Sequence, residues 1–235
     1  MSEDIKKNKI FNSRALAAVA AALLCIPVSI IGLGKESGHY YLAATIIIIL
    51  SMIPFFIKFE SGRVKTEELV ILAVIIAMGV ASRAVFAFLP GFKPMAAFII
   101  IAGIVFGAEA GFLTGALSMF VSNFIFGQGS WTPWQMFAYG ICGLLTGLLF
   151  RTGILKKNRI FLGIYGFLVV FFIVGPLLDT SSLFVLTSEG TDILGIYLAG
   201  MPMNASQGAA VGVTLFLISK GMFEKLDRIK IKYGL

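Results

Sequence analysis

Long apolar segments separated by short polar ones run along the whole chain. A helix that crosses a bilayer needs about 20 apolar residues, and continuous apolar runs without alternation favour helices over barrel strands. The apolar segments are residues 15–33, 40–57, 69–89, 95–107, 111–126, 134–150, 160–178 and 206–222. The pattern therefore predicts an all-α membrane protein with eight spanning helices.

The polar stretch 58–68 is the clearest internal boundary. It divides a two-helix membrane extension at 1–57 from a six-helix membrane domain at 69–222, which a basic tail at 223–235 follows. Only a tight turn fits between the fourth and fifth apolar segments, so these two segments are predicted to form a helical hairpin. The last outer connection, 179–205, is predicted to be a long loop with a short surface helix near 192–201.

Composition excludes a soluble domain, because 58% of residues are hydrophobic and only 13% are charged. The net charge of +7 comes from basic residues in short loops. If the N-terminus is cytoplasmic, all of the 19 Lys and Arg residues except Lys35, Arg83 and Lys93 fall on the cytoplasmic side. This asymmetry follows the positive-inside rule and argues against nucleic-acid binding. We expect a multi-pass protein of the cell membrane with both termini cytoplasmic.

Motifs of soluble enzymes are absent from the sequence. It has no phosphate-binding loop, no His-Glu-x-x-His and no Gly-x-Ser-x-Gly. The single histidine, His39, lies at the outer end of an apolar segment, and Cys25 and Cys142 lie inside apolar segments. We therefore expect no catalysis, no metal site and no resident cofactor.

Polar residues inside or beside membrane segments are costly and suggest function. Arg83 either extends to the headgroups or binds a ligand, and Trp131 and Trp134 either form an aromatic belt or line a pocket. Asn204 either caps the last helix or contacts a ligand. The candidate substrate-binding residues are Arg83, Lys93, Asn123, Gln128, Trp131, Trp134, Gln135, Asn204 and Gln207.

Two series of small residues at four-residue spacing are the longest that we single out, because such spacing lets helices approach closely. The first series is Ala73, Ala77 and Ala81. The second is Gly103, Gly107, Gly111 and Gly115, for which packing inside the bundle is favoured over a partner surface.

Taken together, residues from about 67 to 222 resemble the substrate-binding S components of energy-coupling-factor (ECF) vitamin transporters. The resemblance rests on the alanine face formed by Ala73, Ala77 and Ala81. It rests also on the segment Arg83-Ala-Val-Phe-Ala-Phe-Leu-Pro-Gly-Phe-Lys-Pro94 and on the Gly-rich hairpin after it. It rests most specifically on Asn123-Phe-Ile-Phe-Gly-Gln-Gly-Ser-Trp-Thr-Pro-Trp-Gln-Met136. The two N-terminal spans depart from the usual six-helix form.

The resemblance implies a carrier that captures a vitamin from outside. Such S components dock on a membrane coupling protein with two cytoplasmic ATPases and release the ligand inside by toppling. The resemblance assigns docking to Ala73, Ala77 and Ala81. A cobalamin-like or other large cofactor is the first candidate ligand.

Two other classes of function stay open on the sequence. A secondary transporter or channel would normally show internal repeats with interrupted helices, for which Gly175-Pro176 is one break without a clear mate. An intramembrane enzyme would need a buried titratable pair, and Arg83 and Glu109 are the charged residues near the spans.

Overall fold

The computed structural model describes residues 46, 49, 65–129, 131–185 and 193–234. The chain divides into two compact units, Met1–Pro54 and Phe55–Leu235. The two predicted N-terminal spans lie outside the described residues, apart from Ile46 and Ile49, which are helical. Most of the predicted linker, residues 58–64, also lies outside them.

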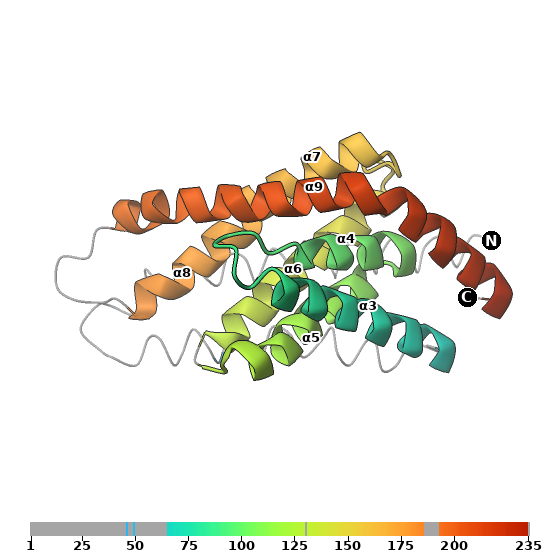
Figure 1. Ribbon diagram of the computed structural model, residues 1–235, viewed down its shortest axis with the longest axis horizontal. Helices are drawn as coiled ribbons and strands as arrows, with labels where there is room; N and C mark the ends of the chain where they lie inside the picture. Colours follow the sequence, from blue (N-terminus) through green and yellow to red (C-terminus); the bar gives the residue numbers. More distant parts are fainter. Residues whose placement is uncertain (1–45, 47–48, 50–64, 130, 186–192, 235) are drawn as a thin grey trace, which may run out of the picture. The chain divides into compact units, whose positions relative to one another are not determined.

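The described part of the second unit consists of helices and short connections, with no strand among the described residues (Figure 1). In chain order it contains α3 (Thr66–Val85), α4 (Met95–Phe106), α5 (Ala108–Phe126), α6 (Thr132–Arg151), α7 (Arg159–Val169), η1 (Val170–Val174), α8 (Gly175–Val185) and α9 (Ile193–Tyr233). Among the described residues, α3, α5, α6 and the stretch Arg159–Ser182 are long and apolar enough to cross a membrane. The prediction of an all-α membrane protein is confirmed.

One continuous helical path leads from α7 through η1 into α8. Proline cannot donate a backbone hydrogen bond, and its ring crowds the preceding turn. The wider π-turn η1 lies just before Pro176, and the N–H of Gly175 bonds to the carbonyl of Val170, five residues back. The break that the sequence shows at Gly175-Pro176 is therefore a π-bulge within a helix, and the helix is not interrupted.

The short helix α4 forms the centre of the unit. Its residues from Met95 to Val105 are all buried, and it packs against α3, α5, α6 and α9. Twelve residues rise about 18 Å, which is less than the roughly 30 Å of a hydrocarbon core. Its uniformly apolar surface is thus explained by contact with protein on every side.

Helices α5 and α6 approach each other through glycine. A methyl group at Gly111 or Gly143 would meet the backbone of the other residue, and one at Gly115 would meet the carbonyl of Tyr139. Gly103 likewise faces the carbonyl of Gly143, so these glycines pack inside the bundle as expected. Gly107 has a φ of 96° and makes the one-residue turn of the α4–α5 hairpin.

The predicted loop at 179–205 is wrong. Helix α8 runs to Val185 and α9 begins at Ile193, with Pro202 inside it, so the last helix starts well before residue 206 and includes the expected surface helix. Hydrogen bonds between the two helices compensate for the polar residues that suggested a loop. Asn204 donates to Asp179 at 2.7 Å, and the hydroxyls of Thr180 and Tyr197 lie 2.8 Å apart.

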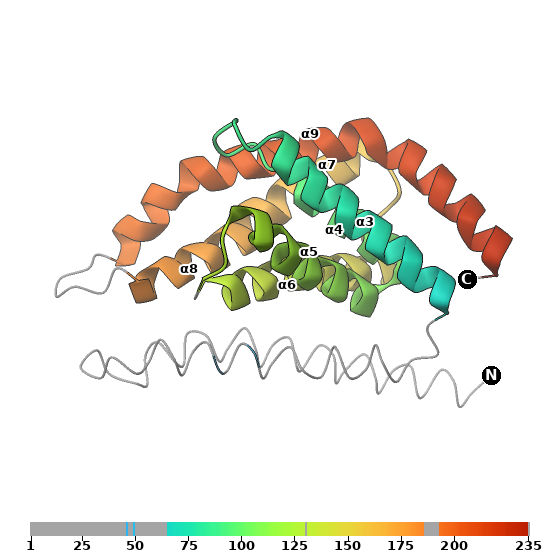
Figure 2. The same ribbon diagram turned by 60° about the horizontal axis from the view of Figure 1, so that its bottom comes forward.

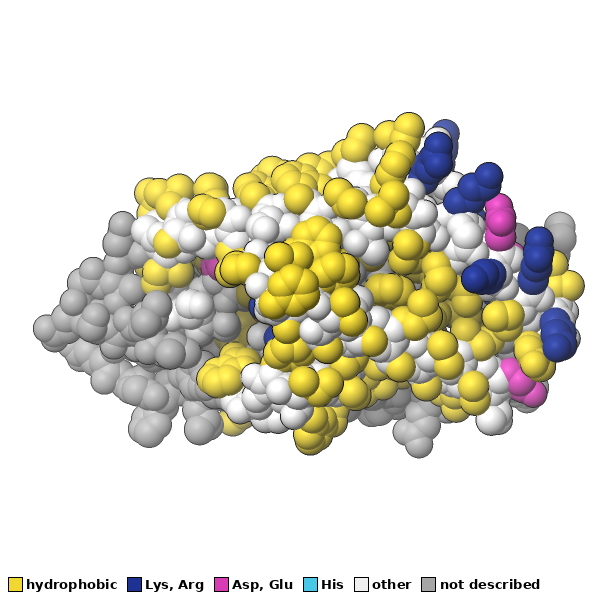
Figure 3. Space-filling model, viewed as in Figure 1, with side chains coloured by type: hydrophobic (Ala, Val, Ile, Leu, Met, Phe, Trp, Pro, Cys, Tyr) yellow, Lys and Arg dark blue, Asp and Glu magenta, His cyan; other side chains and the backbone are white. Residues whose placement is uncertain are grey.

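Basic side chains gather at one end of the second unit (Figure 3). We call this the basic end; it contains the α6–α7 connection and the C-terminal part of α9, which continues as a helix through residues 223–233. Lys157 pairs with Asp227 at 2.9 Å, and Lys230 donates to the carbonyl of Val105 at 2.8 Å, at the end of α4. These contacts tie the last turns of α9 to the bundle.

The close contact between Gly111 of α5 and Gly143 of α6 predicts opposite effects on stability for two Gly→Ala variants. Gly143→Ala should lower the free energy of unfolding by roughly 1–3 kcal/mol, because the methyl group displaces α5. In Gly221→Ala the new methyl group would lie in open space beside α9, so this variant should raise the free energy of unfolding by about 0.5–1 kcal/mol. Thermal unfolding of the purified chain in detergent compares the two, and equal effects would contradict this packing.

Candidate functional site

A cluster of polar side chains connects α3, α5 and α6 at the end opposite the basic end. We call it the polar cluster; its members are Arg83, Ser122, Asn123, Gln128, Thr132 and Gln135. Four of these were predicted as candidate binding residues from the sequence, and the structure brings those four together through hydrogen bonds.

Arg83 extends from the last turn of α3 toward α5. Its Nη1 donates to Ser122 Oγ and to Asn123 Oδ1, the latter at 3.1 Å, and lies 3.9 Å from Met119 Sδ. The guanidinium also stacks over the ring of Phe126 at 4.5 Å. All four partners are neutral, so the positive charge is solvated by dipoles and a π-face and none of the four neutralises it.

Asn123 joins the three helices because its amide oxygen and its amide nitrogen both form hydrogen bonds. Its oxygen accepts from Arg83, while Nδ2 donates to Gln135 Oε1 at 2.8 Å and to Thr132 Oγ1 at 3.2 Å. Asn123 is buried, and Gln135 is half-buried on α6. Thr132 in turn donates to Gln128 Oε1 at 2.9 Å. The polar atoms of the cluster are thus held in one connected network.

The two tryptophans have different environments. Trp134 is 1% exposed and belongs to the core of the bundle, whereas Trp131 is 44% exposed. The indole of Trp131 lies against Gly129, where a methyl group would collide with it. Gln128 is exposed and donates to the carbonyl of Phe120 at 3.0 Å. Trp131 and Gln128 are therefore the accessible members of the α5–α6 connection.

The candidates on α9 belong to a second polar set. Gln207 Oε1 lies 3.5 Å from the hydroxyl of Tyr139, and buried Asn204 bonds to Asp179 of α8. Tyr139 follows Gln135 by one turn of α6, so residues of both sets lie on the same face of that helix.

The α3–α4 connection, residues 86–94, lies against α9. At Gly91, which has a φ of 75°, a side chain would collide with Ser206 and press on Met203. Figure 2 shows this loop beside α9. Lys93 in the same loop is half-buried. Its burial, and next the positive charge of Arg83, lower the pKa of the Lys93 ammonium below its ordinary value.

Four residues of these sets are absent from the candidates predicted from the sequence, namely Ser122, Thr132, Tyr139 and Asp179. Ser122 completes a buried series with Thr114 and Ser118 at four-residue spacing on α5, and that period was a usable signal. Tyr139 and Asp179 gave no such signal, because each becomes polar-paired only through a residue on α9.

Ala73, Ala77 and Ala81 are all exposed on one face of α3. Large apolar side chains beside them are exposed as well, with Val70 at 59% and Val74 at 53%. This face is apolar and carries small residues, and such a surface suits either lipid or another helix.

The chemistry available at the polar cluster is binding. Amide, hydroxyl and guanidinium groups offer both donors and acceptors next to aromatic rings, which suits a flat polar ligand. Among the described residues, no group of three or more His, Cys, Asp and Glu side chains could hold a metal ion.

The comparison with protein families matches residues 63–223 to the model described as "ECF-type riboflavin transporter, S component". No curated protein and no solved structure matches the chain. The match covers more than half of the sequence and contains both polar sets and the alanine face. The chain therefore belongs to the family of S components of ECF-type riboflavin transporters, which are non-catalytic, substrate-binding transport subunits.

Proposed function

We propose that this S component captures riboflavin at the polar cluster. The observation that carries the proposal is the network in which Asn123 joins Arg83 to Gln135 across three helices. One edge of a flavin ring carries two carbonyl oxygens and an N–H between them, which complement amide and guanidinium groups. The family description names riboflavin, so we propose riboflavin in place of the cobalamin-like ligand favoured by the sequence.

The residues proposed to surround the ligand come from both polar sets and include Lys93 and the two tryptophans as well. Asn123 and Gln135 offer hydrogen bonds to the ring, and Trp131 offers an exposed aromatic face. Lys93 and the loop that carries it cover the site from the α9 side. The full proposed set is Arg83, Lys93, Asn123, Gln128, Trp131, Trp134, Gln135, Asn204 and Gln207.

We further propose that the basic end faces the cytoplasm and that both termini lie there, in the cell membrane. Lys and Arg accumulate at that end, in agreement with the positive-inside rule (Figure 3). The polar cluster would then open to the outside. Ala73, Ala77 and Ala81 would dock on a membrane coupling protein that carries two ATPases, because the exposed small residues allow close helix contact.

Binding by the chain alone tests the ligand. Titration of riboflavin with the purified chain in detergent should quench flavin fluorescence to saturation, while cobalamin should not compete. Gln135→Ala should weaken riboflavin binding roughly tenfold, or about 1.4 kcal/mol, because a paired hydrogen-bonding group is lost. Thr152→Ala at the basic end serves as the control. Binding of cobalamin without riboflavin would overturn the assignment.

Docking makes a separate prediction. Ala77→Trp should abolish riboflavin uptake into vesicles that contain the coupling protein and ATPases, yet leave riboflavin binding in detergent unchanged, because the bulky ring keeps the partner helix away. Val213→Trp changes an exposed position of α9 in the same way and should leave uptake intact. Normal uptake by Ala77→Trp would remove the docking assignment.

The lowered pKa of Lys93 predicts how the stability of the folded chain changes with pH. Its pKa is lowered in the folded protein, so the folded state holds the proton less tightly than the unfolded state. Stability of the ligand-free chain should therefore rise as the pH increases through the lowered pKa toward 10.5.

Lys93→Gln should raise the melting temperature at neutral pH and remove this rise at alkaline pH. Thermal melts at neutral and at alkaline pH measure both effects, and a lower melting temperature of the variant at neutral pH would contradict the account.

A further inference from the structure

A polar hollow of about 420 Å³ lies at the basic end, between the first turn of α7 and the part of α9 that carries Ser219 and Lys220. We call it the basic hollow; it is lined by Lys157, Asn158, Arg159, Ile160, Ser219 and Lys220. It is distinct from the polar cluster, because none of these residues belongs to either polar set.

Ser219 is the unusual member of the lining. The residue is 1% exposed, and within the described part of the chain its Oγ has no hydrogen-bond partner. A buried hydroxyl without a partner destabilises the folded state, so such groups usually have a bound molecule or a neighbour to bond. Ser219 is one of the residues that line the hollow, and an acceptor atom bound there, close to its buried hydroxyl, would satisfy that group.

The charges around the hollow favour an anion. Lys157 pairs with Asp227 at 2.9 Å, whereas the guanidinium of Arg159 lies over the neutral ring of Phe216, at 5.1 Å. Lys220 is exposed at the rim. The beginning of α7 adds the positive end of a helix dipole, and Asn158 caps that helix through the N–H groups of Ile160 and Phe161.

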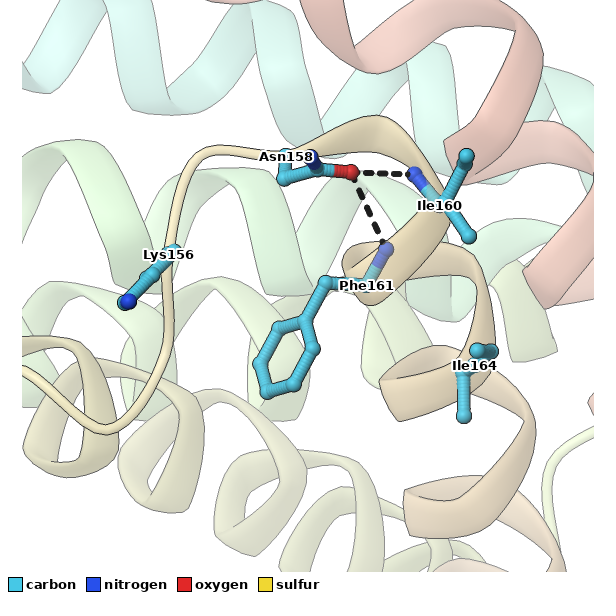
Figure 4. A pocket seen from close by; sticks show the side chains of 5 residues that line it. All are labelled: Lys156, Asn158, Ile160, Phe161 and Ile164. Carbon is cyan, nitrogen blue, oxygen red and sulfur yellow. Dashed lines mark hydrogen bonds between the residues drawn. The ribbon is translucent and has the colours of Figure 1, made fainter.

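An apolar groove of about 310 Å³ adjoins the basic hollow. Its lining residues are Lys156, Asn158, Ile160, Phe161 and Ile164 (Figure 4). Ile160, Phe161 and Ile164 are 58%, 44% and 56% exposed, on a helix that is apolar enough to cross the membrane. The hollow and the groove share Asn158 and Ile160, so both border the first turn of α7.

We propose that the first turn of α7 binds one anionic phospholipid. Its phosphodiester occupies the basic hollow, near Arg159, Lys220 and the hydroxyl of Ser219, and an acyl chain begins along the apolar groove. A cationic hollow followed by an exposed apolar helix face matches the two halves of such a lipid. A soluble phosphate would use only the hollow, and a zwitterionic lipid would gain less from its charge.

The proposal is tested with the full chain, purified in a neutral detergent and titrated with phosphatidylglycerol or phosphatidylcholine. Native mass spectrometry counts the bound lipids. One phosphatidylglycerol should be retained at concentrations at least tenfold below those needed for phosphatidylcholine. Inorganic phosphate at equal concentration should not displace it. Equal retention of both lipids, or full displacement by phosphate, overturns the proposal.

Variants locate the site. The double variant Arg159→Gln/Lys220→Gln should weaken phosphatidylglycerol binding by roughly tenfold or more, since each basic residue near an anionic lipid contributes about fivefold. The control Arg228→Gln/Lys232→Gln removes the same charge from exposed positions of α9 outside the hollow and should leave the binding unchanged. Equal losses in both would show a diffuse charge effect and contradict a site.

Two further changes keep the test independent of folding. Ser219→Ala should weaken lipid binding severalfold while the melting temperature of the lipid-free chain stays equal or rises, because an unsatisfied hydroxyl is removed. Ile164→Gln alters only the exposed groove and should also weaken phosphatidylglycerol binding. Unchanged binding in both variants overturns the placement of the lipid.

Discussion

A positive charge near the end of an apolar helix bundle needs polar partners, and the polar cluster is built around this constraint. Arg83 meets it through Ser122 and Asn123 of α5 and through the face of Phe126. A guanidinium is planar and less strongly hydrated than an ammonium, so it suits such a neutral, partly buried environment. Asn123 in turn donates a hydrogen bond to Gln135 of α6. The three helices are thereby joined by groups that can exchange their hydrogen bonds for those of a ligand.

The scaffold around the polar cluster is divided between two kinds of contact. Central α4 and the backbone-to-backbone approach of α5 and α6 form a densely packed half, in which glycines leave no room for side chains. Helices α8 and α9 are additionally joined by hydrogen bonds such as that between Asn204 and Asp179. Residues of α6 face both halves, and the loop with Gly91 rests on α9. On the proposed function, a ligand at the cluster would lie between the densely packed half and α9.

Apolar run length and turn chemistry predicted much of this fold. The hairpin at Gly107 followed from the short gap between two apolar segments, and internal packing of Gly103, Gly111 and Gly115 was the favoured of two interpretations. The helical connection near Pro202 did not, because local polarity resembled a loop while the stabilising partner of Asn204 lies on α8, 25 positions earlier. In the site, Arg83 and Asn123 were found because polar groups in apolar segments are costly. The burial of Trp134 could not be inferred, since a tryptophan near a loop suits an interface equally well.

The central claim is that riboflavin binds where Arg83, Asn123 and Gln135 meet. An experimental structure of the chain with riboflavin bound tests it most directly. The account predicts the flavin ring within hydrogen-bonding distance of the Asn123 or Gln135 amide, with the network rearranged around it. A ring located away from all three side chains, with their mutual hydrogen bonds intact, would contradict it.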